Sequence, residues 1–481
     1  MMIQIGVAIL LTPFILSYIS HEEYGTYSLA LGSIQFFSMF NFGFGGALGI
    51  LVSRNTKNYS LVSSYSGIVQ SFQLILGLVG LFSGIALSFN FNEFFDVVDK
   101  DNVALKTVVV IFSFSFFVTM LNQVYSTLLV ANRQVALDNK IGIFTSLFGS
   151  LAVIIFLKLG LGIIGLSVSI LITQVLNLVI CFLRVKKSMP DLHISLFKFS
   201  LIDFKNMYVI GIWIFVGSIS VFLIEKFDQF VVSKLLTLEL VGVLVITSKL
   251  FELGKKIIFT ISNNYRPYFG KLLEENKHDL ANKHFLLLRH FTISIAIIFS
   301  SLLVVVNPYF IKLWVGKELY GGDYVSLFLG LNLVYHAWKL PNRAYLSSNL
   351  VVKEQSIFGI FEGLLNVVFS IFLGYRYGLV GIVAGTFLSG FILQIFFYGY
   401  LLNLKNLEST REYVKSQIRL FLNFILFYSL AYIFYLLNAN VQELGVFLFR
   451  FFALVVVSTL IGLLLNIKRL KILRLHMADL G

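Results

Sequence analysis

Cysteine, proline and charged residues are scarce in this 481-residue sequence, and each scarcity excludes a class of protein. The single cysteine, Cys181, excludes a disulfide framework within the chain and any cysteine-rich metal site. Charged residues make up 13% and hydrophobic residues 58%, with a mean hydropathy of +0.89. A soluble chain of this length cannot bury so much apolar surface, because a single core stops growing at about 250–300 residues. The sequence is therefore that of a membrane protein.

Motifs of catalysis and of cofactor binding are also missing. No glycine-rich phosphate-binding loop is present, which argues against an ATPase. The seven histidines are scattered without the spacing of metal ligands. We therefore expect no enzyme activity, no catalytic residues, no cofactor and no bound metal.

Long apolar runs fill most of the chain. Each is long enough to cross about 30 Å of hydrocarbon, and helices satisfy their own backbone hydrogen bonds there. The first run has no basic flank and no cleavage site, so we expect an uncleaved span. We predict an all-α polytopic protein of about 14 transmembrane helices, at residues 3–19, 24–52, 61–89, 103–130, 141–157, 162–183, 206–235, 240–265, 285–314, 324–350, 356–373, 378–402, 418–437 and 444–467.

The net charge of +13 does not indicate nucleic-acid binding. Lysine and arginine collect in alternate connections between the predicted spans and in the C-terminal tail, as the positive-inside rule requires. This pattern predicts a multi-pass protein of the cell inner membrane with both termini in the cytoplasm.

An internal repeat indicates two related halves. Residues 162–167 match residues 378–383 at an offset of 216, and residues 22–25 match residues 239–242 at an offset of 217. We expect a six-helix lobe at 1–185, a cytoplasmic linker at 186–205, a second six-helix lobe at 206–403, and two further helices with a cytoplasmic tail at 404–481. The linker is either a simple connection or an interfacial helix.

Charged residues inside the predicted spans are candidates for a substrate or ion cavity, because a charge in lipid is costly. Glu225 and Asp228 lie three residues apart on one span, and Lys249, Glu252 and Lys256 form a stripe on the next. We expect them to form an ionic cluster between the lobes. The alternative is an ion-paired packing element or side chains that extend toward the interface.

His336, Lys339 and Arg343 form a second stripe, on a span that Pro341 is expected to kink. Such a stripe suits a pyrophosphate or an acidic sugar. Alternatively, Lys339 and Arg343 only end the span, and His336 is a packed histidine. Glu362 is a further single charge to which the sequence assigns no partner.

Small residues and proline mark candidate hinges. Asn41, Gly43 and Gly45 lie inside the second span, where they indicate a broken helix with a polar residue facing the cavity, and Pro13 lies in the first. Close helix packing explains the glycines equally well.

Several of these segments resemble a known family. The segments 20–27, 41–45, 226–235, 266–269 and 377–381 resemble motifs of O-antigen flippases, which form the polysaccharide-transport branch of the multidrug/oligosaccharidyl-lipid/polysaccharide exporter superfamily. The resemblance covers about residues 1–400. Here Val243 and Leu244 follow Gly242, where family members usually have an aromatic residue.

The resemblance implies a flippase for lipopolysaccharide or capsule biosynthesis. Its substrate would be an undecaprenyl-pyrophosphate-linked oligosaccharide, an O-antigen or capsule repeat unit, moved from the cytoplasmic to the outer leaflet by ion-coupled alternating access. Membrane lipid and other polysaccharide-assembly membrane proteins would be its partners. A polar headgroup cannot enter hydrocarbon unaided, so the lobes would enclose a hydrated passage.

Two other functions are compatible with a polytopic fold. An integral-membrane polysaccharide polymerase or glycosyltransferase would be expected to carry a large external loop, whereas the external connections here are short. A multidrug–cation antiporter of the same superfamily is the second alternative.

Overall fold

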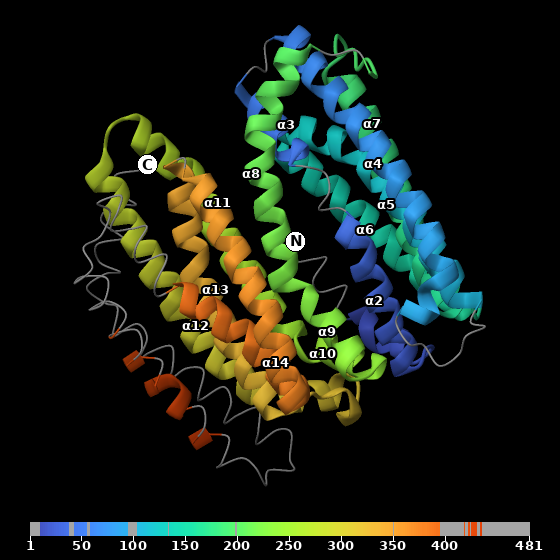
Figure 1. The fold of residues 1–481 in the computed structure, drawn as a ribbon, viewed down its shortest axis with the longest axis vertical. Coiled ribbons are helices and arrows are strands. Elements are labelled where there is room, and N and C mark those ends of the chain that lie inside the picture. Colours follow the sequence, from blue (N-terminus) through green and yellow to red (C-terminus); the bar gives the residue numbers. More distant parts are fainter. Residues whose placement is uncertain are drawn as a thin grey trace. The chain divides into compact units, whose positions relative to one another are not determined.

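The computed structural model describes residues 10–37, 43–54, 58–94, 103–132, 134–197, 200–349 and 351–394, with short helical stretches between 418 and 434. Helices and their connections make up these ranges, and no β-strand occurs in them (Figure 1). The predicted all-α fold class is confirmed. Asn41, the span at 444–467 and the C-terminal tail lie outside the described residues.

The chain divides into two compact units. Unit 1 comprises residues 1–245 with 359–364, and unit 2 comprises residues 246–358 with 365–481. The helices of unit 1 are α2 (His21–Phe37), α3 (Phe44–Arg54), α4 (Tyr59–Phe94), α5 (Val103–Ala131), α6 (Val135–Lys158), α7 (Gly162–Ser188), α8 (Leu201–Glu225), α9 (Phe227–Leu235) and most of α10 (Leu238–Thr247). Those of unit 2 are α11 (Lys249–Glu274), α12 (His278–Trp314), the 3-10 helix η2 (Lys317–Leu319), α13 (Asp323–Ser348) and most of α14 (Val352–Leu393).

Seven of the described helices are long and apolar enough to cross a membrane by length and composition: α4, α5, α6, α7, α8, α12 and α14. In unit 1, α5 packs against α4 and α7, and α6 packs against α7. In unit 2, α11, α12 and α13 pack against one another. The prediction of a multi-pass membrane protein is thus confirmed.

Three predicted spans are interrupted, and in the first of them the sequence analysis had already offered a broken helix near Gly43. The span 24–52 divides into α2 and α3, the span 206–235 breaks at Lys226, and the span 240–265 breaks at Ser248. Gly43 precedes α3 with a φ of +68°, and a Cβ atom there would lie 2.1 Å from the carbonyl oxygen of Gly211 on α8. Only glycine permits both this conformation and this approach. Hydrophobicity alone does not reveal such breaks, because the flanking residues remain apolar.

The spans predicted at 356–373 and 378–402 both fall within α14 as far as the structure describes it. They are separated by Gly378, whose φ of 58° and ψ of −139° are not helical. After this turn Gly381 approaches the backbone so closely that a Cβ atom would lie 2.0 Å from the carbonyl oxygen of Leu373. The boundary predicted near Gly378 is therefore a real change of chain direction.

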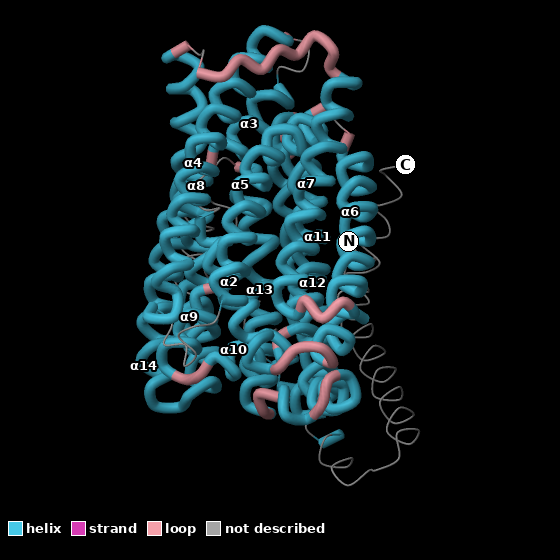
Figure 2. Tube along the Cα trace, turned by 90° about the vertical axis from the view of Figure 1, so that its right-hand side faces the viewer, coloured by secondary structure: helices cyan, strands magenta, loops and turns pink. Residues whose placement is uncertain are grey.

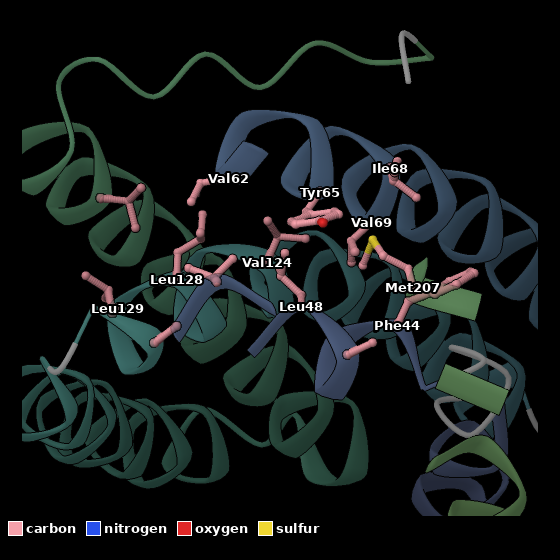
Figure 3. Close-up of a cluster of buried hydrophobic side chains, with 14 of the residues drawn as sticks. Phe44, Leu48, Val62, Tyr65, Ile68, Val69, Val124, Leu128, Leu129 and Met207 are labelled. Carbon is pink, nitrogen blue, oxygen red and sulfur yellow. The ribbon is translucent and has the colours of Figure 1, made fainter. Parts of the chain in front are cut away.

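Large apolar side chains hold unit 1 together. Phe44 of α3 packs edge-on against Phe72 of α4, with ring centroids 4.6 Å apart. Figure 3 shows Leu48, Val124 and Met207 meeting in the same cluster, from α3, α5 and α8. In unit 2, Phe285 of α12 stacks on Tyr345 of α13, with ring centroids 4.4 Å apart.

Candidate functional site

Helix α13 of unit 2 brings charged groups into the interior. His336 and Lys339 are 6% and 5% exposed, and both lie on the stripe that the sequence predicted. Pro341 lacks the N–H that would bond to the carbonyl of Ala337. The hydroxyl of Thr292, on α12, lies 3.2 Å from that carbonyl oxygen and is placed to donate to it. The proline therefore remains inside α13 without leaving this carbonyl unsatisfied.

Several cations surround His336. Lys255 of α11 and Lys339 and Arg343 of α13 all lie close enough to interact electrostatically with it. Arg343 also interacts with Arg266, near the end of α11. We call Lys255, Arg266, His336, Lys339 and Arg343 the cation cluster. The structure thus brings together all three members of the predicted stripe and adds two residues from α11.

Glu252 forms an ion pair with a member of the cation cluster. Its carboxylate accepts a hydrogen bond from Lys255 at 2.7 Å, and the side chain of Glu252 is 54% exposed. Lys249 is half-buried and interacts electrostatically with Glu252, while Lys256 is exposed. The sequence analysis selected Lys256 and not Lys255. On a helix, residues three and four positions after Glu252 are both close to it, so spacing alone does not distinguish the two lysines.

Lys339 also contacts an aromatic ring. Its ammonium nitrogen lies 5.4 Å from the ring centroid of Tyr335. A cation over an aromatic face gains electrostatic attraction, which partly compensates for burial. Nearby on α12, Arg289 is completely buried against Phe285, with its guanidinium carbon 5.2 Å from the ring centroid. Arg289 lies inside the span predicted at 285–314, and the sequence analysis did not select it as a candidate.

Asn342 is a further polar residue of α13 that sequence reasoning missed. It is 0% exposed, and neither atom of its amide group has a hydrogen-bond partner among the described residues. A buried amide without partners is unfavourable unless something else occupies the space beside it. The sequence does contain a signal for Asn342, because this amide lies between Lys339 and Arg343 in a charged stretch of the span.

Glu225 and Asp228 belong to unit 1. Glu225 ends α8 and is exposed, whereas Asp228 begins α9 and is half-buried. The break at Lys226 separates them, so the helical spacing that placed them on one face does not apply. Because Lys249 and Glu252 belong to unit 2, an ionic cluster joining the two pairs stays a prediction.

The candidate hinges lie at close contacts within unit 1. Gly43 touches α8, as described above, and a Cβ atom on Gly45 would lie 2.5 Å from the amide nitrogen of Gln123. Pro13 lies within the helical residues 10–16, where its carbonyl accepts from the backbone N–H of Ser17 at 3.0 Å. Their function as hinges stays a prediction.

Uncharged amide side chains pair with one another inside unit 1. The amide of Gln73 donates to Gln123 at 2.6 Å, and that of Asn122 donates to Asn177 at 3.0 Å. Asn177 in turn donates to the hydroxyl of Thr145 at 3.3 Å. These amides link α4, α5, α6 and α7. Sequence reasoning missed them because it searched the spans for charges.

A family model described as "Polysaccharide biosynthesis protein" matches residues 18–318, which is more than half of the chain. The chain belongs to this family. The resemblance noted in the sequence is thereby confirmed at the level of a polysaccharide biosynthesis family. No match was found among curated proteins.

The fold is that of known transporters. A structure of the lipid II flippase MurJ, in an inward closed conformation, has a TM-score of 0.71 at 16% identity, over 98% of this chain and 97% of that one. An inward-facing multidrug resistance MATE family transporter of the MOP superfamily has a TM-score of 0.66 at 14% identity, over 85% of this chain and 99% of that one. A MATE bound to MaD3S has a TM-score of 0.62 at 16% identity, over 85% and 94%. At these identities the likeness establishes the fold.

Proposed function

We propose that this protein is a flippase that moves an undecaprenyl-pyrophosphate-linked oligosaccharide, an O-antigen or capsule repeat unit, from the cytoplasmic to the outer leaflet of the inner membrane. The observation that carries this proposal is the cation cluster on α11 and α13. It lies in a polysaccharide biosynthesis protein whose fold resembles that of a lipid flippase.

The headgroup chemistry explains why such a cluster is useful. A pyrophosphate carries several negative charges, and charge-assisted hydrogen bonds from lysine and arginine are about twice as strong as neutral ones. Lys339 is 5% exposed and is held by the protein interior, so bulk water screens its charge less than that of a surface lysine. The cluster would replace the hydration that the pyrophosphate loses, while the polyprenyl tail stays in lipid.

Alternating access requires the two repeats to move against each other, and a contact inside unit 1 supports a pivot for this motion. Ser20 caps α2 by accepting from the backbone N–H of Glu23 at 3.1 Å, and Thr237 caps α10 by accepting from that of Leu240 at 3.2 Å. These two caps are 217 positions apart, the offset of the sequence repeat. The repeat-related helix starts are therefore built alike.

The two helix starts also touch each other. A Cβ atom on Gly25 of α2 would lie 2.1 Å from the carbonyl oxygen of Leu238 and 3.2 Å from the nitrogen of Gly242 on α10. Gly25 and Gly242 are equivalent in the repeat. Backbone contact without side chains permits small rotations of one helix on the other, so we place the pivot here. Coupling of the motion to an ion remains part of the proposal.

The test is an assay with purified protein in liposomes that contain a lipid-pyrophosphate oligosaccharide with a fluorescent sugar. The proposal expects protein-dependent movement of the sugar between leaflets, measured by a membrane-impermeant quencher. Covalent extension of the oligosaccharide without movement would instead indicate a polymerase. Transport of a cationic drug but not of the lipid would indicate an antiporter.

A further inference from the structure

The connection between α7 and α8 carries an unusual surface. Both helices are apolar and long enough to span a membrane, so the residues that join their ends lie at the membrane boundary. Residues 189–197 form no helix. Figure 3 shows this connector (green) running along α4, and Figure 2 shows it as a long pink loop.

Small residues of α4 hold the connector in place. The hydroxyl of Ser63 accepts from the backbone N–H of His193 at 3.2 Å, and that of Ser71 accepts from Phe197 at 2.8 Å. Between them, a Cβ atom on Gly67 would lie 2.6 Å from the carbonyl oxygen of Ser195. The three α4 residues follow one another at intervals of four, on one face of the helix. The connector is therefore held against one face of α4.

The seated connector points large apolar side chains outward. Phe197 is 59% exposed and has a φ of +57°, a conformation that is rare for a bulky residue. Leu201 and Ile202, in the first turn of α8, are 82% and 73% exposed. Exposed large apolar side chains of this kind indicate an interaction site. Strain at Phe197 is tolerated because the hydrogen bond to Ser71 fixes its backbone.

Exposed basic side chains lie on both sides of this apolar stretch. Lys186 and Lys187 are exposed in the last turn of α7, and Lys205 is exposed on α8. The nearest acids flank it at both ends: Asp191 is exposed, and Asp203 accepts a hydrogen bond from Ser64. At a membrane surface, lysines can contact negative lipid headgroups while neighbouring apolar side chains contact the hydrocarbon.

We propose that this surface binds anionic phospholipid, with headgroups at the lysines and acyl chains against the apolar side chains. We call it the connector surface, and it consists of Lys186, Lys187, Phe197, Leu201, Ile202 and Lys205. An acidic soluble protein fits less well, because the connector joins the ends of two membrane spans and its apolar residues are placed at the level of lipid. The inference does not depend on the transported substrate.

The experiment uses the full chain in nanodiscs of phosphatidylcholine with or without phosphatidylglycerol. After release into detergent, native mass spectrometry counts the phosphatidylglycerol molecules that each protein retains. The test variant is Lys186→Gln/Lys187→Gln/Lys205→Gln, which removes charge and keeps chain length. The matched control is Lys312→Gln/Lys317→Gln, which removes two exposed lysines of unit 2.

We expect the test variant to retain less than half of the phosphatidylglycerol that the wild type and the control retain, with unchanged phosphatidylcholine. Retention by the wild type should also fall as salt rises, because salt screens the charges. A second variant, Phe197→Ser, should lower retention of both lipids. Equal phosphatidylglycerol retention in the wild type and the triple variant, measured on monodisperse protein, would overturn the proposal. Equal loss in the control would do the same.

Discussion

The polar interiors of the two units differ in the sign of their charge. Unit 1 contains pairs of uncharged amides, such as Gln73 with Gln123 and Asn122 with Asn177, and also the buried carboxyl side chain of Glu362, at 2% exposure. In unit 2 the interior holds cations, with Lys339 at 5% exposure and Arg289 at 0%. Paired amides satisfy each other, whereas buried cations need an anion. We therefore propose that unit 2 recognises a negative headgroup and that the amide pairs of unit 1 are mainly structural.

Removing charge from the cation cluster should have the largest effect. Lys339→Gln combined with Arg343→Gln is expected to lower the initial flipping rate about 100-fold, since hydrogen bonds to charged groups contribute about 1.5–3 kcal/mol each. The rate is measured in liposomes with equal amounts of inserted protein. Lys312→Gln, at an exposed position, serves as the control. If the double variant flips lipid as fast as this control, the proposed role of unit 2 in headgroup recognition is wrong.

Filling the glycine contact in unit 1 should have the next largest effect. Gly25→Ala is expected to slow flipping about 10-fold or more, because the added Cβ atom cannot fit against the carbonyl of Leu238 without moving α10. Gly49→Ala is the matched control, since its Cβ atom would make only an ordinary 3.5 Å contact with Thr127. Equal rates in the two alanine variants would show that unit 1 contributes no pivot.

Lys249→Ala tests the edge of the charged region. We expect a few-fold decrease in polymer export with normal amounts of protein in the membrane, because Lys249 is half-buried beside Glu252. Export is measured as surface polysaccharide in cells that lack the native gene. Unchanged export would remove Lys249 from the functional region of unit 2.

The amide pair of unit 1 should matter least for transport. Gln73→Leu with Gln123→Leu replaces both partners, so no buried amide is left unpaired, and we expect less than a threefold change in flipping rate. Gln73→Leu alone should lower thermal stability, because it leaves the amide of Gln123 without this partner. A large loss of flipping in the stable double variant would show that unit 1 also binds substrate.

Apolar length allowed the sequence to predict the fold class, since runs such as 162–183 recur along the whole chain. It did not allow prediction of the breaks at Lys226 and Ser248, because apolar residues flank both. The stripe of His336, Lys339 and Arg343 was predictable from helical spacing. The neighbours that meet it were not, because contacts between α11 and α13 depend on tertiary packing.

Burial was the property that the sequence revealed least. Arg289 lies inside the span predicted at 285–314 and was not selected as a candidate, yet it is completely buried. Hydropathy treats every arginine alike and does not detect an aromatic neighbour such as Phe285 at 5.2 Å. The sequence left two alternatives for the linker at 186–205, a simple connection or an interfacial helix, and residues 189–197 within it form no helix. Its path depends on the hydroxyls of α4, which are far away in sequence.

The most direct test compares two lipids with the same sugar and polyprenyl chain, one linked through pyrophosphate and the other through a neutral linkage, in liposomes that contain the purified protein. We predict that the wild type moves the pyrophosphate lipid at least 10-fold faster, and that Lys339→Gln with Arg343→Gln abolishes this preference. Equal rates for the two lipids in the wild type, or a preference that survives in the variant, would contradict the claim that the cation cluster of unit 2 recognises the headgroup.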